Sequence, residues 1–141
     1  HKKEVNSDEI FSLFEQTYLA QQGAWQLGNY QVSRDGQADE LQAELVVDNK
    51  AHQLKGSGSG VVASFVDAMQ RFTGQKIVLV EYSEHSLGKS ADAEAICYIQ
   101  LNINGERYCG VGRSHDIIQA SLDGILGAIN LAAQHNRIAA A

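Results

Sequence analysis

The sequence predicts an α+β fold made of two βββα units that form a pseudo-two-fold domain, with antiparallel sheets packed on helices. One pattern, three strand-like runs followed by an amphipathic helix, occurs twice along the 141 residues. A glycine-containing turn, Gly56–Gly60 or Gly110–Gly112, precedes each helix. Because a unit of roughly 55 residues is too small to bury a core alone, we expect the two units to pack on each other, with the sheets on one side and the helices on the other.

The first unit begins with Trp25–Val32, a run rich in aromatic and branched residues that is typical of a β-strand. Asp39–Val47 alternates apolar and polar side chains, and Ala51–Lys55 follows a tight turn as a third, short strand. Apolar residues at helical spacing between Val62 and Phe72 then predict an amphipathic helix.

The second unit repeats this order. Lys76–Tyr82 is a strongly apolar strand, and Ala93–Ile103 alternates apolar and polar side chains. Asn104-Gly105 is a hairpin signal, since both residues tolerate positive φ, and Glu106–Val111 is the returning strand. Apolar residues from Ile117 onward predict a last helix that runs to about Asn136.

The chain divides at about residue 23. Residues 1–23 are predicted to form an N-terminal helix or linker of a longer parent chain, capped by Ser7 or Asp8. Residues 24–141 form the domain proper, with repeat units at approximately 24–74 and 75–137. The first residue, His1, is not methionine, so we expect a piece of a longer polypeptide without the catalytic part of its parent.

Composition narrows the classes of partner. The net charge of −6 disfavours nucleic acid, because an acidic chain repels the phosphate backbone. No apolar run reaches the length that crosses a bilayer, so we expect no membrane partner and a cytoplasmic location. The two cysteines, Cys97 and Cys109, are predicted to be small core residues rather than a disulfide.

Motifs for chemistry are weak. The Gly56–Gly60 run lacks the Lys-Ser or Lys-Thr of a phosphate-binding loop, although a small carboxylate suits a helix start. His85 lies near Glu84 and Asp92, but zinc sites need three or four ligands at supporting spacings, so a polar loop is the favoured interpretation. No serine stands at the centre of a Gly-x-Ser-x-Gly elbow. We therefore predict no catalytic residues and no metal site in this chain.

One pattern points to a ligand. The alternating strand carries Ala93 and Ala95 at its beginning and larger residues such as Ile99 and Leu101 later. Since protein interiors are close-packed, something else fills the space beside the alanines. Protein side chains, a neighbouring subunit and a small apolar ligand of leucine size all remain candidates at this point.

Several blocks resemble the C-terminal regulatory domain of 2-isopropylmalate synthase. The blocks cover most of the stretch from Trp25 to Asn136 and are Gly56–Ala68, Glu81–Leu87, Ala91–Ala95, Gly110–Ser121 and Ala128–Asn130. The resemblance implies a homodimeric domain that binds leucine near the dimer interface and inhibits a separate catalytic barrel of the same parent chain. That barrel condenses acetyl-CoA with 2-oxoisovalerate and uses a divalent metal, whereas no cofactor is expected in this chain.

The resemblance also implies which residues bind the effector. Carried over position by position, they are Val62, Ala63, Leu79, Tyr82, Ser86, Asp92, Ala93, Ala95, His115 and Ile117. Gly58 and Gly60 match glycines whose replacement in the family relieves feedback inhibition. Two positions depart from the family: Val61 stands where proline is frequent, and Ser86 stands where a small apolar residue is common.

Three alternatives accompany this interpretation. The domain senses isoleucine for a citramalate synthase, or it is a purely structural dimerisation module whose alanines pack against the partner chain. The third alternative is a small free-standing enzyme that uses Asp92, His85 or His115.

Overall fold

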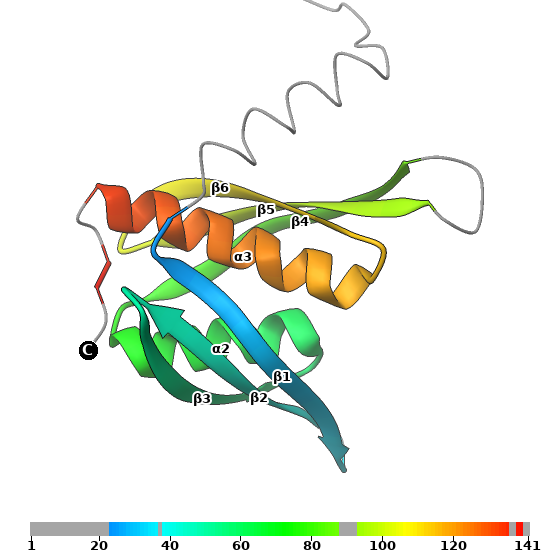
Figure 1. Ribbon diagram of the computed structural model, residues 1–141, viewed down its shortest axis with the longest axis horizontal. Coiled ribbons are helices and arrows are strands. Elements are labelled where there is room, and N and C mark those ends of the chain that lie inside the picture. The colour runs from blue at the N-terminus through cyan, green and yellow to red at the C-terminus, as the bar shows by residue number, and fades with distance from the viewer. Residues whose placement is uncertain (1–22, 37, 88–92, 136–137, 140–141) are drawn as a thin grey trace, which may run out of the picture.

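The computed structural model describes residues 23–36, 38–87, 93–135 and 138–139 (Figure 1). The predicted N-terminal helix within residues 1–23 therefore lies outside the described residues, except for Gly23. The described elements are β1 (Trp25–Asp35), β2 (Ala38–Val47), β3 (Lys50–Gly58), α2 (Val61–Thr73), β4 (Ile77–Leu87), β5 (Glu94–Ile103), β6 (Glu106–Ser114) and α3 (Ile117–Gln134). None of the described helices is long and apolar enough to cross a membrane.

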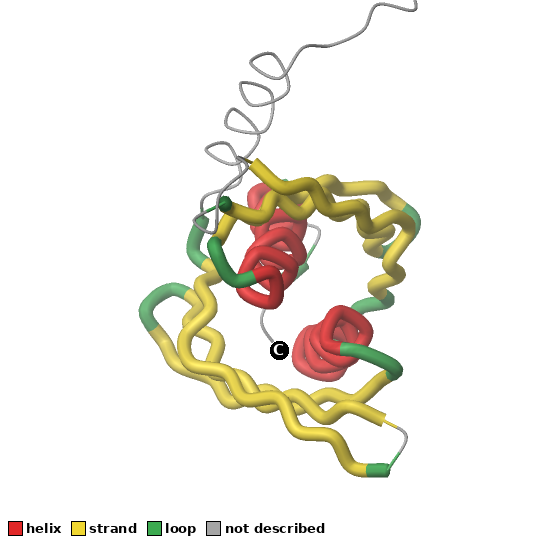
Figure 2. Tube along the Cα trace, turned by 90° about the vertical axis from the view of Figure 1, so that its right-hand side faces the viewer, coloured by secondary structure: helices red, strands yellow, loops and turns green. Residues whose placement is uncertain are grey.

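The strands form two antiparallel sheets, in the orders β1-β2-β3 and β4-β5-β6. The predicted architecture of two βββα units is thereby confirmed. The placement of the helices on one side of both sheets is wrong, because the helices lie between the sheets (Figure 2). Each helix packs on its own sheet and also contacts the first strand of the other, α2 on β4 and α3 on β1. Each helix thus buries two sides, which a single layer of helices would not achieve.

From their second strands onward, the two units correspond position by position with a shift of 56 residues. This shift carries the pair Leu41–Gly56 onto Cys97–Gly112, and the start of α2 at Val61 onto the start of α3 at Ile117. The first glycines of the two predicted turns are therefore not equivalent, because Gly56 corresponds to Gly112 and Gly110 corresponds to Leu54. The first strands match as well, since β1 and β4 each contain a one-residue bulge opposite β2 and β5.

Several elements are longer than the sequence indicated. β1 continues to Asp35 and β4 to Leu87, while α3 ends at Gln134 instead of Asn136. The predicted glycine-rich loop is in part strand, because β3 continues through Gly58. The run of glycine and serine suggested a turn, but these glycines allow close packing against a helix. The strand remains paired with β2 through Gly58.

A close approach of backbones fixes each helix on its sheet. A Cβ atom on Gly56 would collide with the backbone of Ser64 and Ala68 in α2. The equivalent Gly112 meets the backbone of Ala120 and Gly124 in α3 in the same way. The third strand of each unit therefore touches its helix without an intervening side chain, which only glycine permits.

One core joins the two units. It contains the inward-facing residues of both sheets and of both helices, among them Leu41, Leu45, Phe65, Met69, Ile99, Leu101, Leu122, Ile125 and Ile129. Cys97 is buried in the second unit, Cys109 is half-buried, and both are free thiols.

Substitution at the helix contact tests this arrangement. We expect Gly112→Ala to destabilise the domain by ~3 kcal/mol or more, because the helix must move away from the strand. Gly36→Ala is the control, since no atom lies within 4 Å of its added Cβ and only its φ of 68° opposes the change. We expect that control to cost ~1 kcal/mol. Equal shifts in thermal unfolding temperature for the two variants would contradict the close-contact explanation.

Candidate functional site

Small side chains cross the second sheet beside the first turn of α3. Ala95 of β5 pairs with Ser86 of β4 on one side and with Ser114 of β6 on the other. Farther along the same face the residues become larger, and Ile99 is fully buried. The sheet surface is therefore recessed at the end where α3 begins.

This recess is a cavity of about 380 Å³, open to one side. Its lining comes from the end of β4, the start of β5 and the turn into α3, namely Glu84, His85, Ser86, Ala93, Glu94, Ala95, His115 and Ile117. The alanine pattern in the sequence thus corresponds to a real cavity next to Ala93 and Ala95. The lining combines apolar side chains with polar and charged ones, which suits a small molecule that has both characters.

The charges on the rim differ in their partners. Arg113 Nη2 lies 2.9 Å from Glu94 Oε1, and this hydrogen-bonded pair lowers the pKa of the Glu94 carboxyl. Glu84 accepts a hydrogen bond from the hydroxyl of Tyr82 at 2.8 Å. Of the two carboxylates, Glu84 is therefore the one that no described arginine neutralises.

Tyr82 connects the cavity to α3. Its hydroxyl lies 3.0 Å from Ser121 Oγ, and Ser121 also donates a hydrogen bond of 2.9 Å to the carbonyl of Ile117. Cys97 Sγ adjoins both hydroxyls, at 3.4 Å from Ser121 and 3.8 Å from Tyr82. Burial, together with the hydrogen bond to Glu84, raises the pKa of Tyr82 to about 12.

The two helix starts also differ. The side chain of Asp116 caps α3 and accepts the N–H of Ile118 at 2.9 Å. At the start of α2, Gly60 supplies no side-chain cap and has φ 157° and ψ 172°, a conformation that glycine adopts readily. The amides at the start of α2 are thus the better site for an additional anion, because Asp116 already supplies a negative group to α3.

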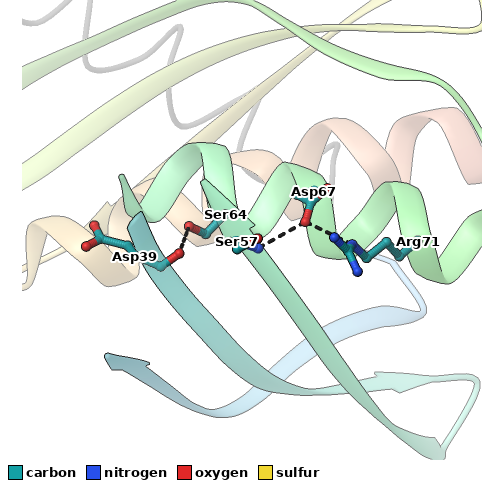
Figure 3. A network of polar contacts seen from close by, with 5 residues as sticks. All are labelled: Asp39, Ser57, Ser64, Asp67 and Arg71. Carbon is teal, nitrogen blue, oxygen red and sulfur yellow. Dashed lines mark hydrogen bonds and ion pairs between the residues drawn. The ribbon is translucent and has the colours of Figure 1, made fainter. Parts of the chain in front are cut away.

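In the first unit, polar side chains tie the helix to its sheet (Figure 3). The hydroxyl of Ser64 donates to the carbonyl of Gly60 at 2.7 Å and also lies 3.2 Å from the carbonyl of Asp39, which brings the first turn of α2 to the start of β2. Asp67 accepts the N–H of Ser57 and the Nε of Arg71, both at 3.0 Å, and so joins α2 to β3. The helix therefore lies directly on its sheet here.

The predicted effector residues fall into three groups. Ser86, Ala93, Ala95, His115 and Ile117 line the cavity. Leu79 and Tyr82 lie on β4 outside its lining, although Tyr82 reaches it through Glu84 and Ser121. Val62 and Ala63 lie in the first turn of α2 and line no part of this cavity, and Asp92 is outside the described residues.

The predicted feedback-sensitive glycines lie at the junction of β3 and α2. A Cβ atom on Gly58 would stand 2.9 Å from that of Ala63, so a larger residue there displaces the start of α2. Gly60 is the residue from which α2 begins.

Sequence reasoning missed four residues, namely Glu84, Glu94, Arg113 and Ser121. Strand pairing explains the first three, because Glu84, Glu94 and Arg113 flank the small residues on neighbouring strands. Ser121 follows Ile117 by one helical turn, and this spacing in the sequence was the available signal.

An apolar strip lies on the edge strand β4. Val78 is 44% exposed, and Leu79, Val80 and Tyr82 are exposed to a similar extent. Two of these residues differ in β1, because its register matches Gln26 to Val78 and Gly28 to Val80, whereas Leu27 and Tyr30 match Leu79 and Tyr82. Since β1 and β4 hold the same place in duplicated units, the valines of β4 are not a requirement of the fold.

These features define a small α+β domain with an open, ligand-sized cavity and an apolar edge. Residues 4–133 match the family model of the LeuA allosteric (dimerisation) domain, and the chain belongs to this family.

Whole-length relatives carry the name 2-isopropylmalate synthase. That of Brucella suis is 33% identical over 132 residues, which are 91% of this chain and 24% of the relative. The proteins of Thermobifida fusca and Clostridium acetobutylicum are 32% and 30% identical, over 93% and 90% of this chain and 23% and 24% of their own lengths. The chain thus spans about a quarter of the length of these relatives.

The environment of Tyr82 has a consequence at high pH. The folded-state pKa of about 12 exceeds the ordinary value of 10.0, so this tyrosine favours folding below pH 10, and that contribution is lost as the pH rises toward 12. We expect the difference in ultraviolet titration between the native chain and Tyr82→Phe to have its midpoint near 12. In denaturant the midpoint should return to about 10. A midpoint near 10 in the folded protein would refute the hydrogen-bonded, part-buried position of this hydroxyl.

Proposed function

We propose that this chain is the effector-sensing and dimerisation module of a 2-isopropylmalate synthase, and that its effector is leucine. The cavity beside Ala93 and Ala95 is the observation that carries the proposal, because small side chains on neighbouring strands leave a recess of ligand size beside the start of α3. An isobutyl group fits a recess floored by alanines and edged by Ile117.

The polar ends of an amino acid also find suitable partners. Glu84 on the cavity rim is suited to receive the ammonium group, as a charge-assisted hydrogen bond. The uncapped amides at the start of α2, where Val62 and Ala63 lie, are suited to the carboxylate. Both helices begin at the same end of the molecule (Figure 1), and in this proposal the carboxylate extends out of the cavity toward the start of α2.

Regulation follows from differential binding. Leucine stabilises whichever arrangement of two copies binds it more tightly. The difference in its binding free energy between the two arrangements is the free energy available for inhibition of an attached catalytic domain. Condensation of acetyl-CoA with 2-oxoisovalerate, and the metal that assists it, belong in this proposal to the remainder of a parent protein.

The apolar strip on β4 is the surface that we assign to a second copy. An edge strand with exposed apolar side chains favours pairing with another chain. A two-fold axis through the contact would place each part of β4 next to the same part of the second copy. An axis in the second half of the strand would bring the like charges of Glu81 and Glu84 together, so that position is disfavoured. The contact is therefore proposed around Val78 and Val80.

Calorimetry tests the effector. We expect heat on titration with leucine and weaker binding of valine, since one methylene changes binding by ~1–3 kcal/mol. Ala93→Leu fills the cavity and should abolish binding while the domain remains folded. Ala51→Leu, on the exposed side of β3, should bind as the native chain does. Stronger binding of isoleucine would reassign the effector, and no heat with any of the three amino acids would refute the sensing function.

Sedimentation tests the dimer surface. We expect Val78→Lys to shift the native dimer toward monomer, because a buried unpaired charge opposes association. Gln26→Lys places the same residue at the equivalent position of β1 and should leave the dimer intact. A native chain that is monomeric at all concentrations, or a Val78→Lys variant that remains dimeric, would overturn this assignment.

A further inference from the structure

A buried asparagine holds the beginning of β1. Asn130 of α3 is 6% exposed, and its side chain bonds to both backbone groups of Trp25. Its Oδ1 accepts the Trp25 N–H at 3.0 Å, and its Nδ2 donates to the Trp25 carbonyl at 2.9 Å. We call these two bonds the Asn130–Trp25 clasp. The clasp joins residues that lie 105 positions apart in the sequence.

The repeat does not require the clasp. A shift of 56 residues places Asn130 at Gly74, the residue that ends α2. The turn of α3 that continues beyond this point is therefore an addition in the second unit. The start of β1 has a second attachment that the repeat does share, since Asp48 N–H bonds to the Ala24 carbonyl as Asn104 N–H bonds to that of Lys76.

The chain passes directly over the clasp. A Cβ atom on Gly23 would lie 2.5 Å from Asn130 Oδ1, so no side chain fits at that position without moving the asparagine. A cavity of about 450 Å³ adjoins the clasp and is lined by Gly23, Ala24, Trp25 and Asn130 among others. The backbone that enters the domain is therefore fixed to α3 beside open space.

The same helix reaches the effector cavity at its other end. Ile117 of its first turn lines that cavity, and Asn130 lies thirteen residues farther on, about 20 Å along the helix axis. A helix packed in a core shifts as a unit, and shifts of 1–2 Å are typical of regulatory transitions. A shift of α3 caused at its first turn would therefore also move Asn130 and the backbone of Trp25 to which it is hydrogen-bonded.

We propose that Asn130 is a positioning residue that transmits occupancy of the cavity to the segment entering the domain at Gly23, through the Asn130–Trp25 clasp. The inference rests on the proposed function, because it assigns a route by which that function acts. It goes further in naming one side chain, outside the cavity, on which transmission depends.

Trp25 reports on the clasp directly. It is the only tryptophan of the chain, is 5% exposed and packs edge-on against Phe72 with ring centroids 6.0 Å apart. We expect leucine to change both the emission of Trp25 and the exchange rate of its amide hydrogen. In Asn130→Ala, leucine should bind within about threefold of the native affinity while both Trp25 responses disappear.

Two further variants separate transmission from stability. Gln70→Ala removes a similar hydrogen bond at the start of β4, which the N–H of Ile77 donates to Gln70 Oε1 at 3.0 Å. It should destabilise the domain comparably and keep the Trp25 responses. Asn130→Asp retains an oxygen that can accept the Trp25 N–H, but it has no donor for the Trp25 carbonyl. We therefore expect reduced changes in Trp25 emission and amide exchange.

The outcomes distinguish failure of the clasp from failure of the sensing function. If leucine binds and Trp25 does not respond, or if Asn130→Ala keeps the response, the inference is overturned and the sensing function stands. If no branched-chain amino acid binds, Ala93→Leu replaces the ligand by filling the cavity from within the chain. Ala93→Leu should then alter Trp25 emission and amide exchange when Asn130 is present, and should not do so when it is combined with Asn130→Ala. An equal effect of Ala93→Leu in both proteins would overturn the inference.

Discussion

The contact between each helix and the third strand of its unit is the constraint on which the rest of the molecule depends. Gly56 and Gly112 allow the helix backbone to touch the strand, and this sets the depth at which α2 and α3 lie between the sheets. Any side chain at these positions would separate helix and sheet, and the shared core would no longer close. The cavity, the capped start of α3 and the clasp at Asn130 all take their positions from a helix seated in this way.

Given the same constraint, the two units have diverged in opposite directions. The first unit ties its helix to the sheet through Ser64 and Asp67. In the second unit the position of Ser64 is taken by Ala120, which has no hydroxyl to bond across, and a row of small residues leaves a recess. The edge strands differ as well, since β1 has Gln26 and Gly28 where β4 has the exposed Val78 and Val80.

The sequence was sufficient for the architecture, because strand alternation, the Asn104-Gly105 turn and helical spacing are local signals that agree with one another. It was also sufficient to find the recess, since Ala93 and Ala95 interrupt a strand of larger residues. It failed where two elements meet. The strand character of Gly56–Gly58 and the register of the repeat depend on which helix lies against these glycines, and the bonds of Asn130 depend on a partner 105 residues away. No local pattern encodes such contacts.

The hydrogen bonds that tie the first unit together have an evolutionary consequence. A duplicated domain that stabilises itself through one copy leaves the other copy free to vary, so exchanges among Ser86, Ala95 and Ser114 alter the size and polarity of the recess without touching the glycine contacts. A lineage can thus acquire a receptor for a differently shaped metabolite by a few substitutions, while the scaffold and its attachment to the rest of a protein are inherited unchanged.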